Sequence, residues 1–97
     1  MGVGDVLRFN WTVDALESVE AQGLQAADVQ AVLTGPGPRL MQAINDDVLR
    51  VIARGPAGLL IEVWLTEQPD GEYDIWTAFE AGAISRARWI NAFGEDR

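Results

Sequence analysis

The chain has 97 residues, and its 15 acidic residues outnumber seven basic ones, so the formal net charge is −8 at pH 7. The seven basic residues are all Arg, and the sequence contains no Lys, Cys or His. A disulfide framework and a thiolate or imidazole metal site are therefore excluded, and the commonest general base is absent. The acidic balance disfavours RNA as a partner, because nucleic-acid affinity comes largely from phosphate neutralisation.

The length fits one domain over residues 1–97, and no apolar run is long enough to span a membrane. We expect a cytoplasmic protein with no cofactor and with another protein, or a second copy of the chain, as its partner.

The first predicted element is a half-buried strand, because apolar and polar residues alternate over residues 7–13. Asp14 and Glu17 have the spacing of a capping box, which predicts that a helix begins there. The strand is therefore expected to end near Trp11 or Thr12.

The first helix is expected to end at Gly23, a natural C-cap, and a second helix is predicted over residues 24–34. Gly35 stops this second helix, and "GPGP" at residues 35–38 is a loop. The pattern over residues 39–45 is ambiguous, and a short edge strand is one interpretation.

The C-terminal half predicts three strands in an antiparallel meander, followed by a helix. "LLIEVWLTE" is nearly continuously apolar, which indicates a strand buried on both faces. The fold class is therefore α+β, with a small antiparallel sheet of about four strands, two N-terminal helices and one C-terminal helix, in the order β-α-α-β-β-β-α. These elements are expected at residues 48–54, 59–67, 73–79 and 83–93, with a turn at Asp46–Asp47 and a hairpin loop at 68–72.

Alternation along the strands predicts two distinct sheet faces. One face would carry two Trp residues with acids and Arg, and the other would pack on the helices. Such an aromatic and cationic face could stack bases and hold phosphates, but Trp residues at a core or a protein interface are the interpretation that we favour. The first face comprises Arg50, Ile52, Arg54, Leu60, Glu62, Trp64, Thr66, Asp74, Trp76 and Ala78; the second comprises Ile61, Val63, Leu65, Ile75 and Phe79.

The last helix carries two Arg residues and a Trp. Arg86 and Arg88 are two residues apart and point in different directions, whereas Arg86, Trp89 and Phe93 share a side. This helix could pack through Trp89 and Phe93, or through its Ile and Ala positions, with the Arg residues in solvent.

The chain resembles the BrnT-like toxins, which belong with the RelE/ParE group of toxin–antitoxin systems. The resemblance covers roughly residues 9–89 and rests on the segments "FNW", "AQGLQAADVQAVL", "GLLIEVW" and "WTAFEAGAISRARW". It implies a type II toxin with endoribonuclease activity and a cognate antitoxin as partner. In this interpretation Arg50, Arg54 and Arg86 would bind phosphate and Glu80 would be the base.

An alternative is a catalytically inactive relative that acts as a protein-interaction module with an acidic surface. Three positions depart from the family pattern: Gln22 replaces a His, Phe79 replaces an Arg, and Ser85 replaces a Glu. In either interpretation Trp64, Trp76, Trp89 and Arg88 are the candidate binding residues.

Overall fold

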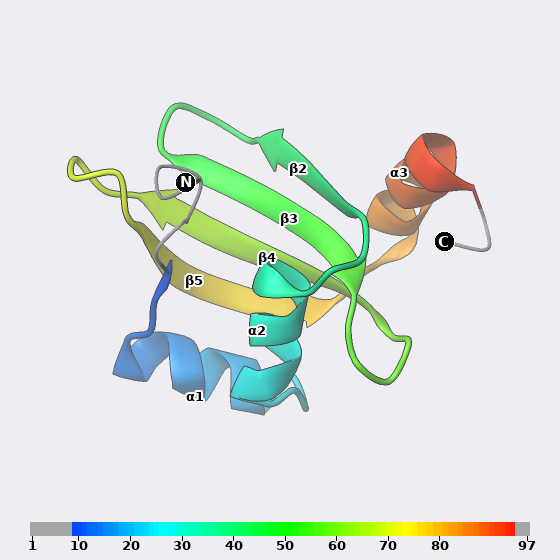
Figure 1. Ribbon diagram of the computed structural model, residues 1–97. Coiled ribbons are helices and arrows are strands. Elements are labelled where there is room, and N and C mark those ends of the chain that lie inside the picture. The colour runs from blue at the N-terminus through cyan, green and yellow to red at the C-terminus, as the bar shows by residue number, and fades with distance from the viewer. Residues whose placement is uncertain (1–8, 95–97) are drawn as a thin grey trace.

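The computed structural model describes residues 9–94 and confirms the α+β fold class (Figure 1). The first two positions of the predicted N-terminal strand, 7 and 8, lie outside the described residues. The elements in chain order are β1 (Phe9–Asn10), α1 (Val13–Ala21), α2 (Ala26–Thr34), β2 (Arg39–Ala43), β3 (Val48–Arg54), β4 (Leu60–Glu67), β5 (Tyr73–Glu80) and α3 (Ala83–Phe93).

The sheet has five strands in the order β1-β5-β4-β3-β2. Strands β3 to β5 form the antiparallel meander that the sequence predicts. The ambiguous segment is the edge strand β2, which extends the meander by pairing antiparallel with β3. The expectation of an all-antiparallel sheet is wrong, because β1 pairs in parallel with β5 through Phe9 and Tyr73. Alternation in the sequence identifies a strand but does not identify its neighbour.

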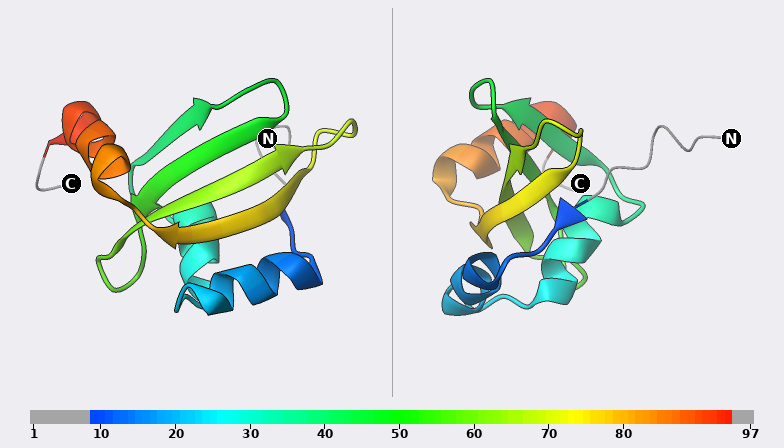
Figure 2. Two further views of the ribbon diagram at one scale, coloured as in Figure 1. Left: turned by 180° about the vertical axis from the view of Figure 1, so that it is seen from behind. Right: turned by 90° about the vertical axis from the view of Figure 1, so that its left-hand side faces the viewer.

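The helices lie on both faces of the sheet (Figure 2). Helices α1 and α2 cover one face, and α3 lies against the opposite face at the end of β5. Burial on both sides explains the continuous apolar run of β4, in which five of the first six residues are buried. The largest fully buried side chains are Trp89, Ile52, Leu60, Ile61, Leu65, Ile75, Val19, Val29, Val32, Val51 and Val63.

The start of α1 is fixed by Thr12 rather than by Asp14. The Thr12 hydroxyl accepts a hydrogen bond of 3.0 Å from the backbone N–H of Ala15, so Thr12 is the N-cap. Asp14 is instead the second residue of the helix, where its charge favours the positive end of the helix dipole. Gly23 follows the helix with a φ of 80°, as a glycine after a C-terminus commonly does.

A β-bulge in β5 changes which side chains face α1 and α2. Trp64 pairs with Thr77 and the next residue, Leu65, pairs with Ile75, so Trp76 is an extra residue in the ladder. Beyond the bulge the side chains exchange faces relative to a regular strand. The bulge reverses the predicted placement of two residues: Ala78 pairs with Val63 on the α1–α2 face, and Phe79 pairs with Glu62 on the α3 face.

The N-cap assignment can be tested by replacing Thr12. Thr12→Ala should lower the free energy of unfolding by about 1 kcal/mol, because the Ala15 N–H loses its partner. Thr12→Ser keeps a hydroxyl and should change stability much less. Urea unfolding followed by circular dichroism measures both; equal destabilisation by the two variants would contradict the assignment.

Candidate functional site

Two Trp residues form an aromatic platform on the α3 face of the sheet. We define the platform as Trp64 of β4 and Trp76 of β5. Their rings meet edge to face with centroids 5.6 Å apart and an interplanar angle of 65°. Trp64 is half-buried, whereas Trp76 is 54% exposed, a large fraction for an aromatic side chain. The platform therefore offers apolar area to a partner.

The platform is anchored to α3 by a buried carboxylate. Glu62 is 4% exposed and accepts hydrogen bonds from the Ser85 hydroxyl and from the indole N–H of Trp64. Ser85 is the third residue of α3, so the Glu62 charge lies close to the positive end of that helix. The N-cap of α3 is Gly82, which has no side chain to cap the helix. The Glu62 carboxylate is therefore a negative group that can stabilise this helix end. Glu62 thus joins α3 to the platform.

Arg50 lies next to the platform and opposite Trp64 in the ladder. Its guanidinium donates a 2.7 Å hydrogen bond to the side-chain oxygen of Gln42 on β2. The Nε atom of Arg50 is buried and has no partner among the described residues. The sheet therefore holds this side chain in place, with part of its donor capacity unused.

An acidic hollow lies at the end of the sheet where β4 ends and the β2–β3 turn leads into β3. The hollow is open, has a volume of about 580 Å³, and is lined by acids from the β2–β3 turn and the end of β4. Thr66 lies in its wall and is two residues from Trp64, on the same face of β4. The backbone N–H of Glu67 donates a 2.8 Å bond to the Asp47 carbonyl, which holds the turn against β4. The lining residues are Asp46, Asp47, Thr66, Glu67, Gln68 and Pro69.

The four residues proposed for catalysis do not gather at one place. Arg50 and Arg54 lie on one face of β3 but are four residues apart, or about 13 Å along the strand. Ile52 lies between them and is completely buried. Glu80 and Arg86 form an exposed ion pair of 3.7 Å where β5 leads into α3. Of the four, only these two are brought into direct contact by an ion pair.

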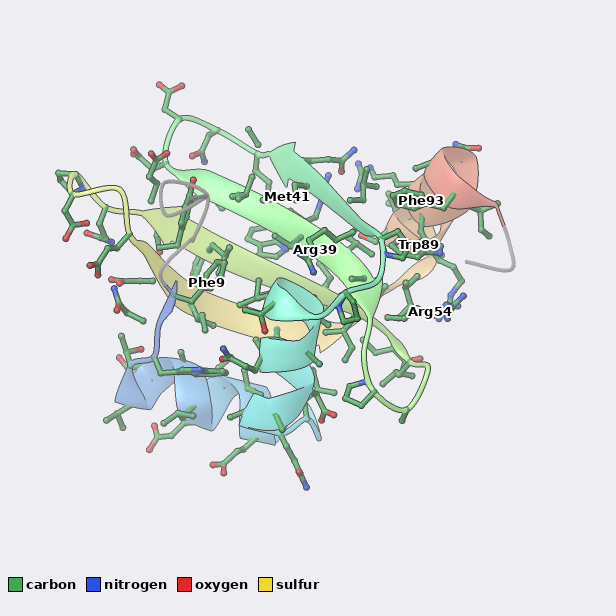
Figure 3. All side chains as sticks on the ribbon, viewed as in Figure 1. Phe9, Arg39, Met41, Arg54, Trp89 and Phe93 are labelled. Carbon is green, nitrogen blue, oxygen red and sulfur yellow. The ribbon has the colours of Figure 1, made fainter. Side chains whose placement is uncertain are left out.

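Arg54 and Trp89 make contacts within the fold, one with a turn and the other in the core. Arg54 donates a 2.9 Å bond to the Gly58 carbonyl in the β3–β4 turn. Trp89 is 1% exposed and lies in the core, with its ring 4.6 Å from that of Phe93 (Figure 3). Helix α3 therefore packs through Trp89 and Phe93, one of the two arrangements expected. Burial gives Trp89 a packing role in place of the predicted binding role, whereas Arg88 is half-buried.

Comparisons with family models, with curated proteins and with solved structures find no match to this chain. The resemblance to BrnT-like toxins therefore rests on the sequence segments alone. Within residues 9–94 no group of three or more side chains is arranged to hold a metal ion. In the same part of the chain, no helix combines the length and hydropathy that crossing a membrane requires.

The alternation along β4 and β5 predicts that Trp64 and Trp76 share one face, but it predicts neither the anchor nor the hollow. Glu62 and Ser85 are 23 residues apart, and no spacing rule links a strand residue to a helix that follows the next strand. The hollow had a weak signal, because the meander places the turn at Asp46–Asp47 beside the end of β4 at Glu67.

The anchor can be tested through Ser85. Ser85→Ala removes one charge-assisted hydrogen bond from a buried carboxylate, so the free energy of unfolding should fall by about 2 kcal/mol. The indole N–H resonance of Trp64 should also shift, because Glu62 is its acceptor. Ser18→Ala is the matched control, since the Ser18 hydroxyl bonds Thr77 at 2.6 Å on a different part of the sheet. An unchanged Trp64 resonance in Ser85→Ala would contradict the anchor.

Proposed function

We propose that the protein is a toxin-like interaction module of a type II toxin–antitoxin system, which binds a basic segment of its partner protein. The observation that carries this proposal is the exposed ring of Trp76, which contacts Trp64. Trp64 is two residues along β4 from Thr66 in the wall of the acidic hollow. The BrnT-like resemblance suggests the cognate antitoxin as the partner.

An exposed Trp on a rigid strand is a suitable anchor for a protein partner. Trp and Arg dominate the binding energy of protein interfaces, and a Lys or Arg above an indole face gains a cation–π contact. Trp76 packs against Trp64, and the Trp64 indole donates a hydrogen bond to Glu62. The rings are therefore already ordered, and little side-chain entropy is lost on binding. The platform thus supports a preorganised contact.

Electrostatics supports a basic partner. Asp46, Asp47 and Glu67 are all exposed around the hollow, and none of its lining residues within the described range 9–94 is basic. The net charge of −8 adds a long-range field that attracts cationic proteins and repels polyanions. Complementary charge increases the association rate and excludes acidic partners.

This binding mode can be tested with a dye-labelled peptide of eight residues that alternates Arg and Val. Fluorescence anisotropy should show binding that weakens as salt increases. Trp76→Ala should weaken it at least tenfold, and the double variant Asp46→Asn, Asp47→Asn should weaken it several-fold. A peptide with Glu in place of Arg should not bind.

Ile84→Ala is the matched control for Trp76→Ala, because Ile84 is 69% exposed but lies on α3. This variant should bind as the unchanged protein does. Equal binding of the Glu peptide, or wild-type affinity in Trp76→Ala, would contradict the proposal.

A second candidate function is RNA cleavage, which the contact between Glu80 and Arg86 favours. An exposed carboxylate could take the proton of a ribose 2′-OH while the adjacent guanidinium holds the phosphate. The separation of Arg50 and Arg54 from each other, together with the acidic surface, makes this candidate the weaker one.

The second candidate predicts growth arrest when the protein is expressed without its partner. It also predicts a loss of about 100-fold or more in RNA cleavage for Glu80→Gln and for Arg86→Ala. Arg88→Ala is the control on the same helix. Normal growth with folded protein present, and no cleavage of single-stranded RNA, would reject the enzyme and leave the interaction module.

A further inference from the structure

Strand β2 is an open edge of the sheet. It is the last strand in the sheet order, and none of the described strands pairs with its outer side. Figure 1 shows no helix beyond the outer edge along the middle of this strand. The opposite edge of the sheet is covered. There β1 pairs with β5, and α1 lies along β5, with the Ser18 hydroxyl bonded to that of Thr77. An unpaired strand edge is a template for another strand.

The hydrogen bonds of the β2–β3 hairpin identify which amides of β2 point outward. The N–H of Ile44 donates to the Val48 carbonyl, so these two residues form a hydrogen-bonded pair. Such pairs alternate along an antiparallel ladder, so Gln42 and Leu40 are also bonded to β3. The N–H and C=O groups of Arg39, Met41 and Ala43 therefore point away from the sheet.

The side chains of this edge leave it open to an apolar contact. Met41, in the middle of the strand, is 44% exposed, and Ile44 just beyond the strand is 38% exposed. Natural edges are commonly protected by a central charge, a Pro or a bulge. β2 has none of these at its centre, and its one charged residue, Arg39, is at its first position.

The edge is complementary to itself when two copies run antiparallel. A twofold axis at Met41 places the outward amides of Arg39 opposite those of Ala43 in the second copy, and Met41 opposite Met41. All paired groups then point toward each other, which gives about six hydrogen bonds. The charges also match, because Arg39 lies at one end of the edge and Asp46 and Asp47 follow the other end.

We propose that β2 pairs antiparallel with β2 of a second copy of this chain and joins the two sheets into one. This surface is distinct from the aromatic platform, so the proposal does not depend on the function proposed above. The contact is small, and the repulsion between two chains of charge −8 opposes it, so a weak and reversible dimer is expected.

Sedimentation equilibrium provides the first test. The dimer fraction should rise with protein concentration between about 10 μM and 1 mM, the range expected for a small interface. Met41→Pro removes one outward N–H and no hydrogen bond within the monomer, so it should fold and weaken the dimer at least tenfold. Met41→Lys places a charge at the centre of the edge and should act in the same direction. Met41→Val, which keeps an apolar β-former, should retain the dimer.

Amide hydrogen exchange provides a second test that identifies the strand. On concentration, the amides of Arg39, Met41 and Ala43 should become protected, whereas those of Leu40 and Gln42 should already be protected at low concentration. A monomer at 1 mM would overturn the proposal. So would a dimer that a folded Met41→Pro variant leaves unchanged, or exchange protection without this alternation.

Discussion

The carboxylate of Glu62 is the constraint on which the face that carries the aromatic platform depends. A buried charge has a high desolvation cost unless hydrogen bonds satisfy it. Here the donors come from Ser85 on α3 and from Trp64 on the same strand. One group therefore fixes both the position of the last helix and the orientation of a platform ring. Exchanging it for an apolar residue would leave the Trp64 indole N–H without this acceptor.

The sequence was sufficient for the elements whose signals are local. The periodic segments, the glycine stops and the hairpin at residues 68–72 appear where the pattern predicts them, and α3 spans residues 83–93 as expected. What could not be predicted depends on contacts between distant parts of the chain. The parallel pairing of β1, the bulge at Trp76 and the bond between Glu62 and Ser85 are of this kind. A single-residue register change reverses faces, so Phe79 was misplaced although its strand was predicted.

Catalysis and binding require different distributions of side chains over the sheet. Catalysis needs its groups within hydrogen-bond reach of one reacting centre. The Arg residues of β3 are instead separated by buried Ile52. Binding needs an accessible surface with matching charge, and under the proposed function the exposed Trp76 ring and the acids that line the hollow would supply it. One departure from the toxin pattern, Ser85 in place of a Glu, has a structural role here, because the Ser85 hydroxyl donates to Glu62.

The bulge in β5 has a consequence for how related chains can differ in length. Trp76 is an additional residue between two regular stretches of ladder. Loss of one residue at this point would restore regular pairing while leaving Ile75 and Ala78 on their present faces. The same loss elsewhere in β5 would turn every following side chain to the opposite face. Among homologues, a single-residue gap in this strand should therefore occur at the bulge, between Ile75 and Ala78.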